Sequence, residues 1–198
     1  MGAFATKPLV VCLTFLSLAE SLFGADRTNR LDRVWKRYRN EQFGYCVDYP
    51  ARWLKSEAFD GAGMWVGAGA KKHSLPLGEM DVRALRDGVS EHLQTASVSL
   101  TESATIYLHD RKQFQRAQDI QVLDQHTMRL LDAPALFIKD QYRDPLDRHL
   151  WIDEVIFAAR QQILYRIELE CRADQIGRFE PIFQRFAASF QFQCEPGR

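Results

Sequence analysis

The chain has 198 residues, with 26 basic and 26 acidic side chains, so its formal net charge at neutral pH is zero. This length suggests a single domain, and the charge balance argues against a general nucleic-acid binder, which would carry a basic excess. Apolar residues make up 46% of the chain. Such a chain can bury enough apolar surface to offset the entropy lost on ordering, which argues against disorder.

The first 25 residues have the pattern of a signal peptide. One positive charge precedes an apolar run over Pro8–Leu18, which is followed by small residues. The run fits the apolar segment of a signal peptide and is shorter than the roughly 20 residues that cross a bilayer. Cleavage after Ala19, Gly24 or Ala25 stays open, and an uncleaved anchor is the alternative. We expect residues 1–25 to direct export to the periplasm or the exterior, with no transmembrane segment in the mature chain.

Residues 26–40 are rich in basic side chains. Four apolar residues among them recur at the spacing of one helix face: Leu31, Val34, Trp35 and Tyr38. The pattern predicts a basic amphipathic helix, packed on the domain with its basic face in solvent. The alternative is a weak contact of residues 27–39 with an anionic membrane surface, with the apolar face among the headgroups.

Alternation of apolar and polar residues predicts strands in the following part of the chain. Six segments have this character: Phe43–Pro50, Gly61–Ala70, Glu79–Leu85, Ala135–Tyr142, His149–Ala158 and Gln162–Cys171. The last two are joined by a short turn and are expected to pair antiparallel. In the final strand, Ile163, Tyr165, Ile167, Leu169 and Cys171 share one face, which predicts core. The opposite face is charged and is expected to be largely wet or partly covered.

A helix is predicted after the last strand, because apolar residues from Ile176 to Ala187 recur at helical spacing. Pro181 would remove an interior hydrogen bond. We therefore expect Pro181 in the first turn of the main helix or at a kink, with Ala173–Glu180 as a lead-in.

Two weaker helix patterns cover Asp87–Ala96 and Arg111–Gln118, and residues 97–127 have the least definite pattern. Strands in antiparallel order with inserted helices predict an α+β fold, with one domain over residues 41–198.

Three segments of the chain are typical of one known family. They are an aromatic-Gly-Tyr-x-Val-x-Tyr-Pro-x-x-Trp segment at 43–53, Leu131-Asp-Ala-Pro-Ala-Leu136, and Tyr165–Cys171 followed by Phe179 and Arg185-Phe-Ala-Ala-Ser-Phe190. Over about residues 38–192 the chain resembles the PsbP-like α/β/α sandwich proteins, specifically their uncharacterised bacterial exported branch. The resemblance implies a central antiparallel sheet of about six strands flanked by helices. It also implies protein binding rather than catalysis.

The chain has few features of a metal site or a catalytic site. The sequence contains no G-x-S-x-G, S-x-x-K or H-E-x-x-H motif. The best metal candidate is the acidic segment 140–154, where oxygen ligands could suit Ca²⁺ or Mn²⁺. Its weak candidate ligands are Asp144, Asp147, His149 and Asp153. Arg143 and Arg148 can neutralise this segment, so we expect a salt-bridged loop without a metal.

Three cysteines follow residue 25. Cys171 ends the apolar face of its strand and is expected to be a buried thiol. The helix after that strand runs back along it, so Cys194 is expected to lie far from Cys171. We therefore expect a disulfide between Cys46 and Cys194, which suits an exported protein.

Together these patterns favour a non-catalytic exported binding module, acting through protein–protein interaction in the cell envelope, with no cofactor. Four residues that the core pattern leaves unexplained are candidates for partner contacts: Trp53, Met64, Trp65 and Trp151. The alternative is a hydrolase or a metal-dependent enzyme whose site is not recognisable in the sequence.

Overall fold

The computed structural model describes residues 34–69, 76–86, 99–113 and 117–194. The expected signal peptide over 1–25 and the weak helix pattern Asp87–Ala96 lie outside these ranges. The elements in chain order are β1 (Trp35–Arg39), β2 (Cys46–Pro50), β3 (Leu54–Glu57), β4 (Gly63–Ala68), β5 (Gly78–Arg86), α2 (Leu100–Gln113), β6 (Gln118–Leu130), β7 (Ala133–Arg143), β8 (Leu150–Arg160), β9 (Ile163–Arg172), a 3₁₀ turn (Ala173–Gln175) and α3 (Ile176–Ala188).

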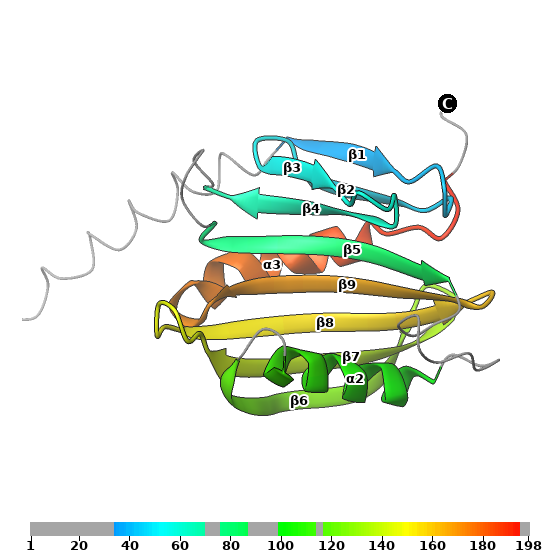
Figure 1. Ribbon diagram of the computed structural model, residues 1–198. Helices are drawn as coiled ribbons and strands as arrows, with labels where there is room; N and C mark the ends of the chain where they lie inside the picture. The colour runs from blue at the N-terminus through cyan, green and yellow to red at the C-terminus, as the bar shows by residue number, and fades with distance from the viewer. Residues whose placement is uncertain (1–33, 70–75, 87–98, 114–116, 195–198) are drawn as a thin grey trace, which may run out of the picture.

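Seven strands form one antiparallel sheet in the order β3-β4-β5-β9-β8-β7-β6, and β1 pairs with β2 in a separate two-stranded sheet. Helix α2 packs on one face, over β7 and β8, and α3 packs on the other face, against β9 and β2 (Figure 1). The expected α+β sandwich is thus confirmed, with seven strands in the main sheet where about six were expected. None of the described helices is long and apolar enough to cross a bilayer.

The alternation in β9 separates two cores. Tyr165, Ile167, Leu169 and Cys171 face α3 and pack in a large cluster with phenylalanines of α3 and with aromatic residues of β2. Leu164 faces the other way and joins a smaller cluster under α2, which includes Tyr107. As expected, β8 and β9 pair antiparallel, and the charged face of β9 is covered in part by α2.

The helix expected over residues 26–40 is not formed where the structure describes it, because Trp35–Arg39 is strand β1. Pairing with β2 supplies the backbone hydrogen bonds of this segment, and the Tyr38 ring packs 6.0 Å from that of Tyr45. Tertiary pairing therefore overrides the helical spacing of the apolar residues. The remainder of the segment lies outside the described residues, and the strand removes the basis for a helical membrane contact at 35–39.

Two other boundaries differ from expectation. The helix near Arg111 covers Leu100–Gln113, and the chain from Gln118 onward is the long strand β6. Strand β6 lies at the sheet edge with side chains exposed on both faces, so it lacks the alternation that marks a half-buried strand.

Pro181 lies inside α3 rather than in its first turn, since the helix begins at Ile176. Pro181 has no N–H, so the carbonyl of Gly177 loses its helical donor. Pro181 and Gly177 are both exposed. Water can therefore hydrogen-bond to that carbonyl, which lowers the cost of the interior proline.

Candidate functional site

A row of carboxyl side chains crosses the middle of the main sheet. Strand register places Asp140 of β7 opposite Asp153 of β8, Asp153 opposite Glu170 of β9, and Glu170 opposite Glu79 of β5. These four residues, called the acidic row below, lie on neighbouring strands about 4.8 Å apart and face α2. Like charges directly opposite each other on a sheet are destabilising, so the row needs compensation.

The next two positions along the strands continue the polar surface. Asp81 of β5 stands opposite Glu168 of β9, and Arg83 of β5 stands opposite Arg166 of β9. Arg166 donates to Asp81 at 3.2 Å and contacts Glu168 at 3.0 Å. Six carboxyl groups are therefore gathered on one face, with Arg166 pairing two of them.

Helix α2 supplies the second buried cation of this face. The Arg111 side chain is 2% exposed, contacts Asp153, and lies 3.5 Å from Glu168 and 3.4 Å from Glu170. Its guanidinium lies 4.4 Å from the centre of the Tyr142 ring, a cation–π contact. Arg111 thus adds charge contacts to the apolar packing of α2 on the sheet.

The hydroxyl of Tyr107 constrains the protons in this cluster. It lies 3.0 Å from Asp153 Oδ2 and 2.8 Å from Glu168 Oε1. A hydroxyl has one hydrogen to donate, so both contacts are hydrogen bonds when one carboxyl is protonated. Burial raises the pKa of Asp153 well above its usual value, whereas the pKa of Glu168, which burial acts to raise, is held below its usual value by Arg166 and Arg111. The two pKa shifts have opposite directions, so Asp153 takes up a proton at a higher pH than Glu168 does.

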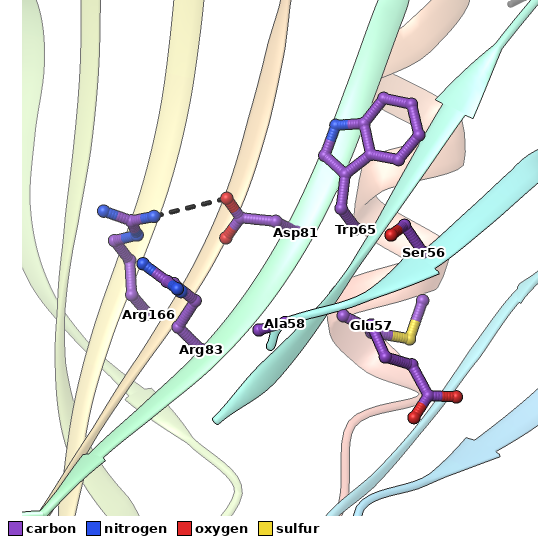
Figure 2. A pocket seen from close by; sticks show the side chains of 8 residues that line it. Ser56, Glu57, Ala58, Trp65, Asp81, Arg83 and Arg166 are labelled. Atoms are coloured by element: carbon purple, nitrogen blue, oxygen red, sulfur yellow. Dashed lines mark hydrogen bonds and ion pairs between the residues drawn. The ribbon is translucent and has the colours of Figure 1, made fainter. Parts of the chain in front are cut away.

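Two connected cavities open on this face. The outer cleft, of about 460 Å³, is bordered by Ser56 and Trp65 and by Asp81, Arg83 and Arg166 (Figure 2). The inner cavity, of about 120 Å³, has six lining residues: Glu79, Asp81, Arg111, Arg166, Glu168 and Glu170. Asp81 and Arg166 line both, so the outer cleft lies next to the inner cavity.

The carboxyl groups nearest the entrance have perturbed pKa values. Burial raises the pKa of Glu79 to about 7, with Glu170 adding to the effect. Burial also raises the pKa of Asp81 to about 7, against the opposing effect of Arg166, and that of Asp140 to about 6. Perturbed carboxyls in a cleft are a feature of functional sites, although structural ion clusters produce them too.

These shifts predict how stability depends on pH. Between about pH 4.5 and pH 7 the folded chain keeps protons on Glu79, Asp81 and Asp140 that the unfolded chain has released, so stability falls as pH rises through this window. We expect the melting temperature, measured with a chelator present, to be a few degrees lower at pH 7.5 than at pH 5. The E79Q/D81N double variant should show a flatter profile, and D144N should match the wild type. A wild-type melting temperature that rises from pH 5 to pH 7.5 would contradict the assignment.

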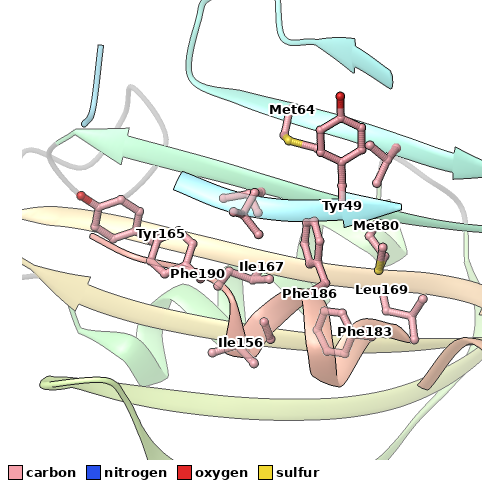
Figure 3. Packing of buried hydrophobic residues seen from close by; sticks show 14 of the residues in the cluster. Tyr49, Met64, Met80, Ile156, Tyr165, Ile167, Leu169, Phe183, Phe186 and Phe190 are labelled. Carbon is pink, nitrogen blue, oxygen red and sulfur yellow. The ribbon is translucent and has the colours of Figure 1, made fainter. Parts of the chain in front are cut away.

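The opposite face of the sheet carries an apolar groove of about 450 Å³ between α3 and strands β6 and β7. Phe183 of α3 and Ile156 of β8 form its inner wall (Figure 3), and Met128 and Phe137 lie on its outer side. Leu131, at the end of β6, is 55% exposed. Lys139 of β7 donates to Glu180 of α3 at 3.0 Å, so α3 reaches β7, and the groove lies between this helix and the edge strand β6.

The residues singled out from the sequence do not form one site. Trp53, Met64 and Trp151 are buried, with Trp53 packed on Phe179 at a ring distance of 5.8 Å, so these three side chains contribute to cores instead of a surface. Trp65 is the partly exposed member of the four and borders the outer cleft.

The four weak metal candidates are also separated. Asp144, Asp147 and His149 lie in the turn between β7 and β8, where Asp144 accepts from the backbone of Leu146 and Asp147 accepts from that of His149. These carboxylates shape the turn. Asp153 is fully buried under α2 and belongs to the acidic row.

Sequence reasoning missed Arg111, Glu79 and Asp81 as parts of this site. The charged face of β9 was a visible signal, but its partners come from strands distant in sequence. By contrast, the structure contains the expected disulfide between Cys46 and Cys194, and Cys171 is a buried free thiol.

No protein-family model and no curated protein sequence matches this chain. Solved structures do. Cyanobacterial PsbP from Synechocystis, CyanoP, is similar with a TM-score of 0.56 at 13% identity, over 79% of this chain and 91% of that one. The chain has a PsbP-like fold.

Two further structures with a similar fold come from other bacteria. LpqN of Mycobacterium tuberculosis, described as involved in cell envelope biogenesis, has a TM-score of 0.51 at 10% identity, over 84% of this chain and 95% of that one. A protein of unknown function from Pseudomonas aeruginosa has a TM-score of 0.50 at 9% identity, over 83% and 98%. At these identities the similarity concerns the fold alone, and function is argued from the sites.

Proposed function

We propose that this protein is an exported, non-catalytic binding module that holds an extended apolar segment of a partner protein in the cell envelope. The observation that carries the proposal is the apolar groove beside the edge strand β6. Three features support export: the signal-peptide pattern of residues 1–25, the Cys46–Cys194 disulfide, which suits an oxidising compartment, and the described role of the PsbP-like neighbour LpqN in envelope biogenesis.

The edge of β6 is suited to accept a strand. Its pairing with β7 has irregularities between Gln118 and Asp124 and is regular from Asp124 to Leu130. In the regular part, His126, Met128 and Leu130 face the groove. A segment added beside β6 would place every second side chain on the same face of the sheet. Backbone hydrogen bonds would then supply affinity, and apolar side chains in the groove would supply specificity.

The chemistry of the groove selects the partner segment. Its floor is made of methionine and phenylalanine side chains, which adapt to varied apolar shapes. Its border carries polar side chains of both signs, including Arg129 and Glu180. A segment with alternating apolar and polar residues therefore fits better than a strongly charged one.

The test uses a displayed library of random peptides and the two variants M128D and T127D. Met128 is partly buried at the groove, whereas Thr127 is exposed and points to the other face of β6. The wild type and T127D should enrich peptides with alternating apolar residues, and bound peptide should protect the amides of 124–130 from hydrogen exchange. M128D should lose this enrichment by at least about tenfold. Equal enrichment by M128D, or protection from hydrogen exchange confined to the outer cleft beside Trp65, would refute the proposal.

A second candidate function is supported by the outer cleft. Carboxyl groups with pKa values near 7, such as those of Glu79 and Asp81, suit general acid–base catalysis. A hydrolase or metal-dependent enzyme would use them. Turnover of ester, phosphate or glycoside model substrates that disappears in the E79Q/D81N double variant would favour this candidate over the binding module.

A further inference from the structure

The acidic row and Glu168 bring carboxylate oxygens unusually close together. Asp153, Glu168 and Glu170 each offer one oxygen, and these three atoms lie within 4.8 Å of one another. Oxygen ligands of one Ca²⁺ lie 2.3–2.6 Å from the ion, so two of them are separated by at most roughly 5 Å. The three residues stand on the adjacent strands β8 and β9, which hold their backbones in fixed register.

Buried oxygens without a partner lie in the same place. Asp140 is 0% exposed, and neither of its carboxylate oxygens has a hydrogen-bond partner among the residues that the structure describes. Asp153 is also 0% exposed, and its Oδ1 has none, although its Oδ2 contacts Tyr107 and Arg111. Asp140 and Asp153 are directly opposite in register and point to the same face. Buried polar atoms are nearly always paired, so these oxygens are places where water or a cation would bind.

Acidic side chains outnumber basic ones around the inner cavity. The inner cavity is lined by four carboxyl groups and two arginines, and Asp140 and Asp153 lie beyond Arg111. Arg111 contacts three of these carboxylates and Arg166 two. Two guanidinium groups face six carboxyls, so protons or a bound cation supply the remaining positive charge.

From this geometry we propose that Asp153, Glu168 and Glu170, with Asp140 directly beside Asp153, bind one hard divalent cation of the Ca²⁺ or Mn²⁺ class. The donors are oxygen atoms, which these ions prefer, whereas softer metals favour cysteine and histidine. The inner cavity of about 120 Å³, lined by Glu168 and Glu170 among others, has room for a few waters beside these two ligands, since a water occupies about 30 Å³. The outer cleft shares Asp81 and Arg166 with this cavity and lies next to it. This site lies on the opposite face from the groove of the proposed function and is independent of it.

Calorimetric titration of the chelator-treated full chain with CaCl₂ and, separately, MnCl₂ tests the proposal. We expect one site with a dissociation constant of about 10⁻⁴–10⁻³ M, the range of extracellular calcium modules, and a rise in melting temperature at 5 mM cation. E170Q and D140N should each weaken binding by about tenfold or more. D144N and D147N, in the turn between β7 and β8, are the matched controls and should bind like the wild type.

D140N separates ligation from folding. Asparagine has nearly the same shape and carries no buried charge, so the variant without cation should melt at or above the wild-type temperature while its cation affinity falls. Absence of heat and of a melting shift at 5 mM cation would overturn the proposal. So would wild-type affinity in both D140N and E170Q, or loss of binding in D144N or D147N.

Discussion

Replacement of Arg111 by methionine should lower the free energy of unfolding by about 3–5 kcal/mol, the usual cost of leaving a buried charge without its partner. Arg111 is 2% exposed and contacts Asp153, Glu168 and Glu170. Methionine keeps much of the volume but removes the positive charge from these carboxylates. Denaturant unfolding followed by circular dichroism gives the difference directly.

Arg39 provides the control for this prediction. It pairs with Glu41 at 3.3 Å, and both side chains are largely exposed, so R39M should cost less than about 1 kcal/mol. Adding D153N to R111M should recover part of the loss, because one of the orphaned carboxylates is then neutral. An R111M protein within 1 kcal/mol of the wild type would show that the carboxyls are fully protonated or otherwise neutralised without the arginine.

Loss of the Cys46–Cys194 disulfide is the second large expected effect. The bond joins residues 148 positions apart, and closing a loop of that length in the unfolded chain corresponds to about 5 kcal/mol in the chain-entropy model, with measured losses of about 2–5 kcal/mol. The bond also fastens β2 to the segment after α3, where Cys46 and Gln191 exchange backbone hydrogen bonds. The C46A/C194A variant should therefore unfold at a clearly lower denaturant concentration.

Reduction of the wild type by dithiothreitol should reproduce this loss, and C171A should respond to reduction as the wild type does. Cys171 is buried and free, so it takes no part in the effect. Peptide mapping without reduction should recover residues 46 and 194 in one linked pair. A linked pair containing Cys171, or an unchanged unfolding midpoint after complete reduction, would contradict the prediction.

The disulfide could be predicted from the order of the elements along the chain. Cys171 lies at the end of an apolar strand face, and a helix follows that strand, so the distance of Cys194 from Cys171 follows from the order of elements. The core could be predicted from a local pattern as well. Alternation in β9 separates Tyr165 and Ile167 from Glu168 and Glu170, since successive residues of a strand face opposite sides.

The candidate sites could be predicted less well from the sequence. Trp53, Met64 and Trp151 were indistinguishable in the sequence from surface residues, because burial of a residue near a turn depends on what packs against it. The prediction of a helix over residues 26–40 was wrong for a similar reason. Tyr38 fits the apolar face of a helix as well as a strand, and the pairing with β2 decides between them. Strand β6 gave no signal because an edge strand exposed on both faces has no reason to alternate.

The sequence by itself therefore determined the class of fold, the two faces of each half-buried strand and the helix that covers the larger core, all of which depend on residues near one another along the chain. It also determined the disulfide, through the order of the elements that carry Cys171 and Cys194. The tertiary structure decided which charged faces meet. Strand β5 pairs with β9, far from it in sequence, and this pairing places Glu79 beside Glu170 and Asp81 beside Glu168. Arg111 reaches them from a helix between β5 and β6. The acidic row exists because strand order, which no local pattern encodes, aligns four separate carboxyl groups in one register.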